Sequence, residues 1–290
     1  MRSILDAVAA GYLVSWDRVI LEVNDTLCQM LGFSREELVG SQMPWPFMPP
    51  EGVELALALA DKLVSEALHP ATSTGQSFEV PMMRKDGTRF ICEVVLRLAR
   101  KSDGSALGWV STIRDISRRH DYEAELERLA THDPLTGLAN RRLFDQRLDQ
   151  EMSNAIRYGH PLAVAILDLD RFKDVNDQHG HPVGDRALRE TARRLESVQR
   201  RGDLFARVGG EEFAWILPEV ESHGAWAAVE RARHEISDVP FSGIGHLTIS
   251  IGVGLRGDLE ECAALYERAD QSLYRAKRDG RNRSIMWRPV

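Results

Sequence analysis

The alternation of apolar and polar positions divides the chain into three parts. Residues 1–117 carry short runs of period two with brief helical stretches, a pattern typical of a small antiparallel sheet with helices. Residues 118–131 are highly charged and predict a linking helix. From residue 132 to residue 290, segments follow in the order α-β-α-β-β-α-β-α, which predicts helices around a mostly antiparallel sheet. The chain therefore belongs to the α+β or α/β class, with two domains.

Turn and cap signals separate the elements that we expect in the first part. Short strands are recognised by alternating apolar positions, and helices by an Asn, Asp or Ser at their start. The expected elements are two strands around residues 17–18, helices capped near residues 24–25 and 34–37, a helix over 51–68, a hairpin turning at 85–88 and a last strand over 108–117.

The strands of the last part are more apolar. The run over 161–170 is nearly continuous and predicts a buried strand. Gly209 and Gly210 separate two further runs and permit the positive φ values of a tight hairpin. The last helix is expected to stop at Gly280. The remaining expected elements are helices over 141–159, 183–200 and 222–237 and a strand over 247–255.

Composition narrows the class of protein only slightly. Hydrophobic residues make up 43% and charged residues 28% of the chain, which is enough to bury a core. The net charge is −7 and no block of Lys and Arg stands out, so we expect no nucleic-acid partner. No apolar run approaches the about 18 residues of a membrane span, and the N-terminus does not resemble a signal peptide. We expect a cytoplasmic protein without a membrane partner, with its three cysteines reduced.

Carboxylates gather at the ends of predicted strands. Glu211 and Glu212 follow the glycine turn side by side, and Asp168 and Asp170 end the apolar run on one face of its strand. Neighbouring carboxylates repel each other unless a cation joins them. Such oxygen ligands suit Mg²⁺, which completes its shell with water and phosphate, so the pattern indicates a nucleoside triphosphate. The two aspartates alone read equally well as solvated turn acids.

The segment that follows, residues 170–185, is expected to be a turn that meets the nucleotide. Lys173 could meet a phosphate, and backbone N–H groups of the turn could cradle phosphates. Asn176 and Asp185 form a polar pair that fits guanine, because an Asp can accept from the N1 and N2 protons of that base. The alternative is structural: a turn Asn, and an acid at a helix start.

Two cations, Lys277 and Arg281, lie one turn apart near the end of the last predicted helix. Cations at that end of a helix interact favourably with its dipole. Their functional interpretation is a clamp on the β and γ phosphates of the nucleotide.

Five motifs of the last part resemble the successive signatures of GGDEF-domain diguanylate cyclases. They read HDPLTGLANRR, DLDRFKDVND, RVGGEEF, ISIGV and YRAKRDGRN, in that order, between about residues 131 and 288. The GGDEF signature appears as GGEEF, a variant associated with active members. The resemblance implies a nucleotidyl-cyclase-like fold over residues 132–290 and a homodimer that condenses two GTP into cyclic di-GMP and two pyrophosphates.

The resemblance also implies a role for each residue that matches a motif. Two Mg²⁺ ions per active site, with Mn²⁺ as an alternative, would be held by Asp168, the carbonyl of Leu169 and Glu211. Of the three residues expected to be catalytic, Glu211 is preferred for assisting deprotonation of the attacking hydroxyl, Glu212 would support the metal site, and Lys173 would hold the triphosphate. The residues implied in GTP binding are Asn176 and Asp185 for guanine, Arg171, Phe172, Lys173, Lys277 and Arg281 for the triphosphate, and Gly209 and Gly210 for access.

An RxxD motif precedes the glycine hairpin. Arg200 and Asp203 stand where the family has its inhibitory product site, at which Arg stacks on guanine and Asp accepts from the edge of that base. Arg231, on the following helix, would be a secondary contact. RxxD alone is a weak signal, so its position carries the hypothesis of inhibition by cyclic di-GMP.

Residues 1–117 resemble a PAS sensor domain. The resemblance rests on EVNDTLCQMLGFSREELVG, RKDGTRFICEV and IRDISRR, and it implies a five-stranded antiparallel sheet with helices over one face. The ligand is unknown: His69 is expected to be a surface residue rather than a haem ligand, and Cys28 a buried structural thiol. Five aromatic residues are expected to build core rather than a cofactor site: Trp16, Trp45, Phe47, Phe78 and Trp109.

The linking segment has two interpretations. Its apolar positions Tyr122, Leu126 and Leu129 fall at i, i+4 and i+7, which is the stripe of a plain amphipathic connector. The alternative is a helix that pairs with its twin in the homodimer. A signal in the first domain would then change the angle or register of the pair, and so how often two active sites face each other.

A second hypothesis belongs to another class: a catalytically silent GGDEF domain that acts as a receptor for GTP or cyclic di-GMP. Such a domain would be expected to lack Asp168, Lys173 or Glu211, and all three are present. A cyclase that also accepts ATP is disfavoured by Asp185 at the guanine position. The enzyme is therefore the leading hypothesis.

Overall fold

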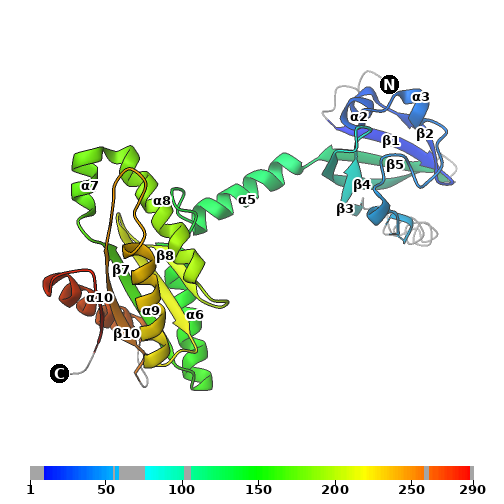
Figure 1. Ribbon diagram of the computed structural model, residues 1–290. Helices are drawn as coiled ribbons and strands as arrows, with labels where there is room; N and C mark the ends of the chain where they lie inside the picture. The colour runs from blue at the N-terminus through cyan, green and yellow to red at the C-terminus, as the bar shows by residue number, and fades with distance from the viewer. Residues whose placement is uncertain (1–9, 55, 59–75, 101–105, 258–260, 288–290) are drawn as a thin grey trace. The chain divides into compact units, whose positions relative to one another are not determined.

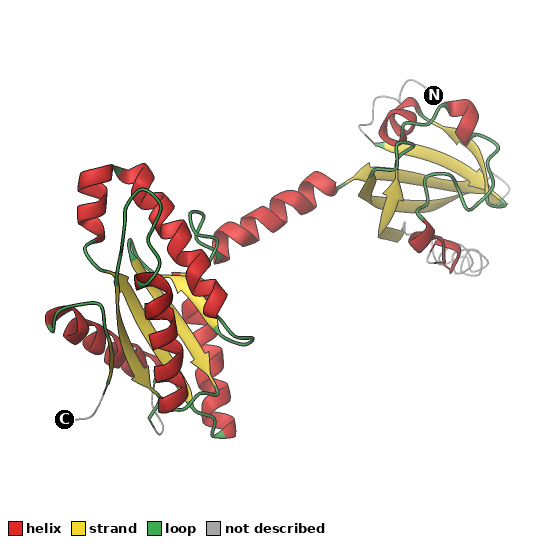
Figure 2. Cartoon of the chain, in the orientation of Figure 1, coloured by secondary structure: helices red, strands yellow, loops and turns green. Residues whose placement is uncertain are grey.

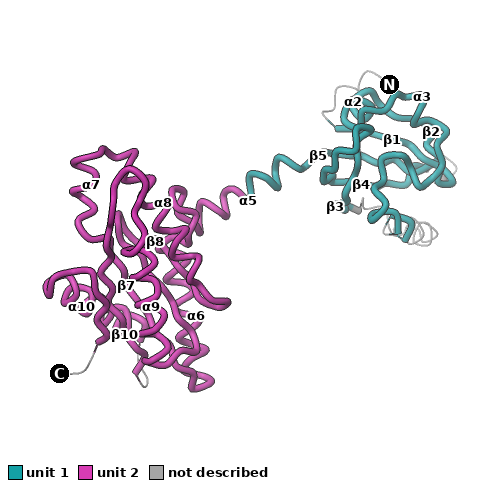
Figure 3. Tube along the Cα trace, viewed as in Figure 1, with its two compact units in different colours: residues 1–124 teal, residues 125–290 magenta. Residues whose placement is uncertain are grey.

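The computed structural model describes residues 10–54, 56–58, 76–100, 106–257 and 261–287. The chain separates into two compact units, residues 1–124 and 125–290, each with its own sheet (Figure 3). The first unit has a five-stranded sheet and the second a six-stranded sheet. The expected fold class is confirmed, because helices accompany an antiparallel sheet in the first unit and surround a mostly antiparallel sheet in the second.

The five strands of the first unit are joined in the order β2-β1-β5-β4-β3, and every neighbouring pair is antiparallel (Figure 1). They are β1 Gly11–Trp16, β2 Val19–Val23, β3 Gln76–Met83, β4 Arg89–Arg100 and β5 Ala106–Asp115. Asp17 and Arg18 turn the chain between β1 and β2 with φ values of 48° and 65°, and Gly87 turns it between β3 and β4 with a φ of 87°. The expected turns at these two places are therefore confirmed.

The short helices of the first unit begin at the predicted caps. The Asn24 Oδ1 atom accepts from the N–H of Leu27 at 3.0 Å, at the start of α2 Asp25–Leu31. Ser34 forms the expected capping box at α3 Arg35–Leu38. The helix expected over 51–68 is described only at residues 53–54 and 56–58, after the 3₁₀ turn η1 Pro50–Gly52; the rest of it, with His69, lies outside the described residues.

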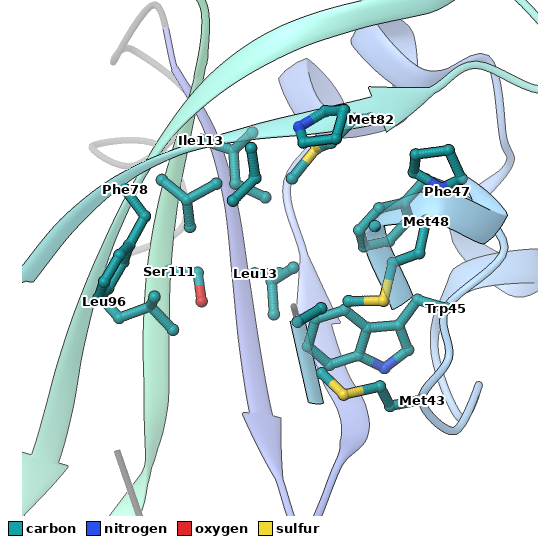
Figure 4. A pocket seen from close by; sticks show the side chains of 16 residues that line it. Leu13, Met43, Trp45, Phe47, Met48, Phe78, Met82, Leu96, Ser111 and Ile113 are labelled. Carbon is teal, nitrogen blue, oxygen red and sulfur yellow. The ribbon is translucent and has the colours of Figure 1, made fainter. Parts of the chain in front are cut away.

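The core of the first unit forms where one face of the sheet meets these helices. Leu13 from β1 and Leu27 from α2 are fully buried, and Phe47 joins them as expected (Figure 4). Trp16 was expected in the core but is 46% exposed, because β1 buries every second residue and Trp16 falls on the outer face. Cys28 packs against the core but is only half-buried.

The second unit has a sheet with the strand order β11-β10-β7-β9-β8-β6. Its strands are β6 Ala139–Asn140, β7 Leu162–Leu169, β8 Leu204–Arg207, β9 Glu212–Pro218, β10 Ile249–Leu255 and β11 Ser284–Met286. The three central pairs are antiparallel, and the outer pairs β6·β8 and β10·β11 are parallel. The outer strands β6 and β11 were not predicted, since two or three residues are too few to carry an alternating pattern.

Helices cover both faces of this sheet (Figure 2). Ala165 and Leu167 of β7 face a core built with α8 and α9, whereas Val164 and Ile166 face a core built with α6 and α10. A strand buried on both faces must be apolar throughout, which explains the continuous run. The helices are α6 Arg141–Tyr158, α7 Phe172–His179, α8 His181–Val198, α9 Ser222–Ser237 and α10 Cys262–Arg278. Within the described residues, no helix is long and apolar enough to span a membrane.

The glycine of the ISIGV motif lets α10 approach the sheet. A Cβ atom at Gly252 on β10 would lie 2.0 Å from the backbone nitrogen of Leu273 on α10. Any side chain there would therefore push helix and strand apart. This close packing holds the C-terminal end of α10 beside the end of β7.

One long helix, α5 Ser117–Thr131, contains the boundary between the two units. The stripe predicted for the linking segment is exposed on it: Tyr122, Leu126 and Leu129 retain 48–68% of their accessible surface. Three large apolar side chains at helical spacing are thus uncovered in the single chain.

Candidate active site

The antiparallel register places two of the predicted carboxylates opposite each other. Asp168 near the end of β7 pairs with Glu212 at the start of β9. Directly opposed residues project their side chains to the same face, about 4.5–5.5 Å apart at Cβ. Glu211 precedes Glu212 in the turn, where its carbonyl accepts from the N–H of Leu169 at 3.3 Å. The structure therefore brings Asp168, Leu169, Glu211 and Glu212 together at one end of the sheet.

The acidic side chains of this cluster repel one another. Asp168 is only 6% exposed, and burial raises the pKa of its carboxyl to about 6. The ammonium of Lys277, 2.7 Å away on α10, acts in the opposite direction, whereas the nearby charges of Glu211 and Glu212 raise the pKa further. One cation thus lies beside three acidic side chains, and a divalent cation would relieve the repulsion.

The residues of this cluster fit a Mg²⁺ ion that takes only some of its ligands from the protein. Within the described part of the chain, no three His, Cys, Asp or Glu side chains form a ready metal cage. Mg²⁺ does not need one, because it commonly uses one or two carboxylates and takes water and phosphate oxygens for the remaining positions. The buried, raised-pKa carboxyl of Asp168, with the Leu169 carbonyl and the carboxylate of Glu211 nearby, is such an incomplete oxygen set.

The turn between β8 and β9 is held by Arg207, a residue that the sequence reading did not single out. Its Nε and Nη2 atoms donate to the carbonyl of Gly210 at 3.0 and 2.8 Å. Its Nη1 atom donates to Asp133, at 3.1 Å from Oδ1, so the turn is also tied to the start of the second unit. Arg207 lies in the motif RVGGEEF and Asp133 in HDPLTGLANRR, and this membership is the sequence signal that could have identified both residues.

The two glycines of this turn do not adopt the positive φ values that we expected. Neither Gly209 nor Gly210 is among the residues with positive φ. At Gly209 the requirement is space: a Cβ atom would lie 2.8 Å from Oε2 of Glu212. At Gly210 a Cβ would meet no atom within 4 Å, so the backbone there faces open space. The bare turn makes room for the Glu212 carboxylate on one side and for a ligand on the other.

The segment over 170–185 is not a turn but two helices, α7 and α8, joined at Gly180 with a φ of 80°. Asn176 lies on α7, and Asp185 lies on α8 just after the first turn of that helix. A Cβ at Gly184 would lie 2.0 Å from the Asn176 Oδ1 atom, so glycine is what allows the two helices to approach there. The sequence analysis did not identify Gly184 as a site residue. Glycine is unfavourable within a helix, so its presence near the start of α8 could have indicated a close approach there.

The predicted cations lie on different elements. Arg171 precedes α7 with a φ of 55°, followed by Phe172, which is buried, and Lys173, which is exposed. Lys277 is on α10, but Arg281 is not, because the helix ends at Arg278 and Arg281 adopts a φ of 65° beyond it. The expectation that Lys277 and Arg281 lie one turn apart near the end of the last helix is therefore wrong for Arg281.

Asp170 makes hydrogen bonds within the fold and does not join Asp168 in the carboxylate cluster. It is buried, and its carboxylate accepts from the hydroxyls of Thr248 at 2.6 Å and Ser250 at 2.7 Å and from the N–H of Asn282 at 3.0 Å. These bonds join the end of β7, the strand β10 and the turn that carries Arg281. Asp170 thus uses its carboxylate within the fold, and the pair of metal-binding aspartates expected at the strand end is reduced to Asp168.

The RxxD residues do come together. Arg200 Nε donates to Asp203 Oδ1 at 2.8 Å; the Asp203 side chain is 1% exposed and that of Arg200 is 47% exposed. The Arg200 guanidinium also bonds to the Pro218 carbonyl. Arg231 is exposed on α9 and, in the described residues, makes no hydrogen bond or ion pair with this pair.

Comparison with known families decides the class of the second unit. Residues 130–283 match the family described as diguanylate cyclase, GGDEF domain. The chain belongs to the GGDEF family. Residues 10–118 match the family described as PAS domain, so both resemblances are confirmed.

Curated relatives share the second unit. Diguanylate cyclase DgcM of Escherichia coli K12 is 40% identical over 173 residues, which is 60% of this chain and 42% of DgcM. Response regulator PleD of Caulobacter vibrioides is 43% identical over 173 residues, 57% of this chain and 37% of PleD. The chain therefore spans less than half the length of these relatives.

Solved structures agree on the fold. The coiled coil and GGDEF domain of DgcB from Caulobacter crescentus, in complex with c-di-GMP, matches with a TM-score of 0.56 and 35% identity over 59% of this chain and 93% of that one. The active GGEEF domain of a diguanylate cyclase from Vibrio cholerae matches with a TM-score of 0.51 and 35% identity, covering 53% of this chain and 99% of that one.

Proposed function

We propose that the protein is a diguanylate cyclase that condenses two GTP into cyclic di-GMP and releases two pyrophosphates. The observation that carries this proposal is the convergence of Asp168, Glu211 and Glu212, with Lys277 at 2.7 Å from Asp168, in a chain of the GGDEF family. The active GGEEF domain from Vibrio cholerae has the same signature letters that this chain carries at residues 209–213.

The residues around this cluster suit a guanine nucleotide. The α7–α8 hairpin brings Asn176 against Gly184, the neighbour of Asp185, so that the two side chains would offer a guanine edge an amide and a carboxylate. Lys173 and the backbone of Arg171 and Phe172 begin α7, beside the end of β7. At this place we assign the triphosphate, since N–H groups and a lysine at a helix start attract phosphate.

The remaining triphosphate contacts come from the end of the chain. Lys277 would leave Asp168 for a phosphate oxygen, and Arg281 would meet the γ-phosphate from the turn held by Asp170. The bare turn of Gly209 and Gly210 would admit the nucleotide.

Asp168, the Leu169 carbonyl and Glu211 would hold two Mg²⁺ ions, or Mn²⁺ in their place. When bound, such ions neutralise phosphate charge and lower the pKa of a nearby hydroxyl. Glu211 would accept the proton of the 3′-hydroxyl of one GTP, whose oxygen attacks the α-phosphate of the other, and Glu212 would keep Glu211 and Asp168 in place. Most of the rate then comes from positioning and electrostatics.

Because the second unit of each chain would hold one GTP, the reaction needs two chains with their second units face to face. The exposed stripe on α5 supports a homodimer, and the related DgcB structure includes a coiled coil. The first unit would regulate the cyclase through α5, by changing how often the two sites meet.

The test is direct. Full-length protein is incubated with GTP and Mg²⁺, and cyclic di-GMP is sought by chromatography. We expect product from the parent and from Glu221→Gln, an exposed control at the start of α9, and none from Glu211→Gln. If neither the full-length protein nor residues 116–290 make product after bound nucleotide has been removed, although the protein binds cyclic di-GMP, the proposal is contradicted and the receptor is supported instead.

A further inference from the structure

The turn that follows α10 has an unfavourable backbone conformation. Its residues Gly280, Arg281 and Asn282 have φ values of 117°, 65° and 45°. A positive φ is uncommon for residues other than glycine, and it persists only where the surrounding structure enforces it. Contacts from elsewhere in the fold must therefore hold this turn in shape.

Two of these contacts act on the backbone of the turn. The N–H of Arg281 donates to the carbonyl of Ala276, in the last turn of α10, at 3.0 Å. The N–H of Asn282 donates to the buried carboxylate of Asp170, just beyond β7, also at 3.0 Å. The turn is thus anchored to the helix before it and to the strand end that carries Asp168.

A third contact comes from α9, a helix that supplies no residue to the carboxylate cluster. The Nη1 atom of Arg233 donates to the side-chain oxygen of Asn282 at 3.0 Å. The Nε and Nη2 atoms of the same guanidinium donate to Glu230, one turn earlier, at 3.1 and 3.0 Å. The Arg233 side chain is only 13% exposed, so the pair with Glu230 fixes the planar guanidinium and directs its remaining edge at Asn282.

The side chain that this turn carries is available to a ligand. Arg281 is exposed, and its guanidinium makes no hydrogen bond or ion pair with any residue that the structure describes. Lys277, in the last turn of α10, lies 2.7 Å from Asp168, so the turn begins beside the carboxylate cluster. A guanidinium held in place beforehand binds phosphate more tightly than one that must be ordered on binding.

We propose that Arg233 is a positioning residue for the triphosphate: acting through Asn282, it holds the turn that presents Arg281 to the γ-phosphate, and so favours GTP over GDP. This role rests on the proposed function, in which Arg281 meets the γ-phosphate. Without Arg233 the turn must be ordered when GTP binds, and the affinity for GTP falls. GDP has no γ-phosphate for Arg281 and keeps its affinity, whereas a role confined to the stability of the fold would affect both nucleotides alike.

Binding can be measured without turnover, because 3′-deoxy-GTP lacks the hydroxyl that would attack. Titration calorimetry on the full-length protein with Mg²⁺ compares 3′-deoxy-GTP with 3′-deoxy-GDP. We expect Arg233→Ala to weaken 3′-deoxy-GTP binding about fivefold, the typical effect of one lost hydrogen bond, and to bind 3′-deoxy-GDP within about twofold of the parent. Arg281→Ala should show the same selective loss. Equal losses for both nucleotides, or parent affinity for 3′-deoxy-GTP in Arg233→Ala, would overturn the proposal.

A second variant tests the route through Asn282. Asn282→Gly removes the side-chain acceptor, while glycine keeps the backbone N–H and tolerates the positive φ. It should reproduce the loss in Arg233→Ala, and the double variant should lose no more than either single variant. Additive losses would refute the route through Asn282, and if Arg233→Ala does not fold, Asn282→Gly decides alone. Arg193→Ala is the matched control: Arg193 makes the same kind of pair with Glu190, on α8, and its loss should leave both affinities unchanged.

The outcomes separate this role from the proposed reaction. A parent that binds 3′-deoxy-GTP but makes no cyclic di-GMP from GTP contradicts the reaction, and the titrations still decide the role of Arg233. A selective loss in Arg281→Ala, with parent affinity in Arg233→Ala and Asn282→Gly, contradicts the positioning role alone.

Discussion

At the scale of single residues, a few polar side chains each join several segments. Arg207 bonds to Gly210 in its own turn and to Asp133 at the start of the second unit. Asp170 gathers Thr248, Ser250 and the backbone of Asn282. Each of these side chains bonds to segments far apart in the sequence, so removing it should also disturb those segments.

The first prediction concerns product inhibition. Arg200 is half exposed and already fixed by Asp203, so it can present its guanidinium to a guanine of cyclic di-GMP. We expect Arg200→Ala to raise the inhibition constant of cyclic di-GMP at least about tenfold, as loss of a charge-assisted contact should. The neighbouring exposed Arg201→Ala is the matched control and should leave that constant unchanged. Initial rates of cyclic di-GMP formation at increasing product measure both, and an unchanged constant in Arg200→Ala would show that the motif is not the inhibitory site.

The second prediction concerns acid stability. Glu190 accepts from Arg193 and from the buried Arg194, whose guanidinium also donates to the Val239 carbonyl at 2.6 Å. The hydrogen bonds from Arg193 and then Arg194 lower the pKa of Glu190 from 4.5 to about 2. A depressed folded-state pKa gives stability that is complete above pH 4.5 and is lost as pH falls towards about 2.

Glu190→Gln should therefore be less stable than the parent at about pH 7, and this difference should shrink as the pH falls to about 3. Urea unfolding at both pH values measures it. Glu196→Gln, which removes an exposed carboxylate from the same helix, is the control and should show no such trend. A difference in unfolding free energy that stays constant with pH would be incompatible with a stabilising Glu190 carboxylate.

At the scale of elements, the site is made by a strand register and a helix hairpin. The β7–β9 register sets Asp168 against Glu212, and a slip by one residue would turn one of them to the opposite face. The α7–α8 hairpin sets Asn176 beside the start of α8, through a glycine rather than through a polar contact.

Gly184→Ala should disturb guanine binding. Its new Cβ would need the position now held by Asn176 Oδ1, so either the side chain or the hairpin must move. Overpacking of this kind costs about 1–3 kcal/mol, and we expect the KM for GTP to rise about tenfold. Arg186→Ala on the exposed side of α8 should keep the parent KM. A folded Gly184→Ala enzyme with a KM within about twofold of the parent would show that this close approach does not position Asn176.

At the scale of the whole molecule, two units that fold around separate cores share one helix. The stripe of α5 is uncovered in the single chain, and its spacing suits a second copy of the same helix. Dimerisation would bury the stripe and bring two sites within reach of each other.

Leu126→Ser should weaken the dimer, because burying one leucine contributes about 1.5–3 kcal/mol. We expect the dimer dissociation constant, measured by sedimentation, to rise at least about tenfold and the rate at low protein concentration to fall with it. Glu127→Ser changes the next residue, off the stripe, and should have little effect on either. If both variants dimerise like the parent, the stripe is not the interface.

The sequence alone was sufficient for the family and for most of the helices and strands, although α7, β6 and β11 were missed, and it named the candidate site residues. Those inferences depend on local signals: the period of apolar positions, the caps at Asn24 and Ser34, and motif letters in order. Their roles in the reaction remain predictions, because no local pattern shows which carboxylate accepts a proton.

Only the tertiary structure decided which residues meet across the chain. The ties of Asp170 to Asn282 and of Arg207 to Asp133 join residues 112 and 74 positions apart, and no local period encodes them. The same holds for Gly209, where the close approach of Glu212 rather than a positive φ requires glycine. Close approaches and buried polar contacts depend on how separate elements pack, and a sequence pattern records only the face that each element buries.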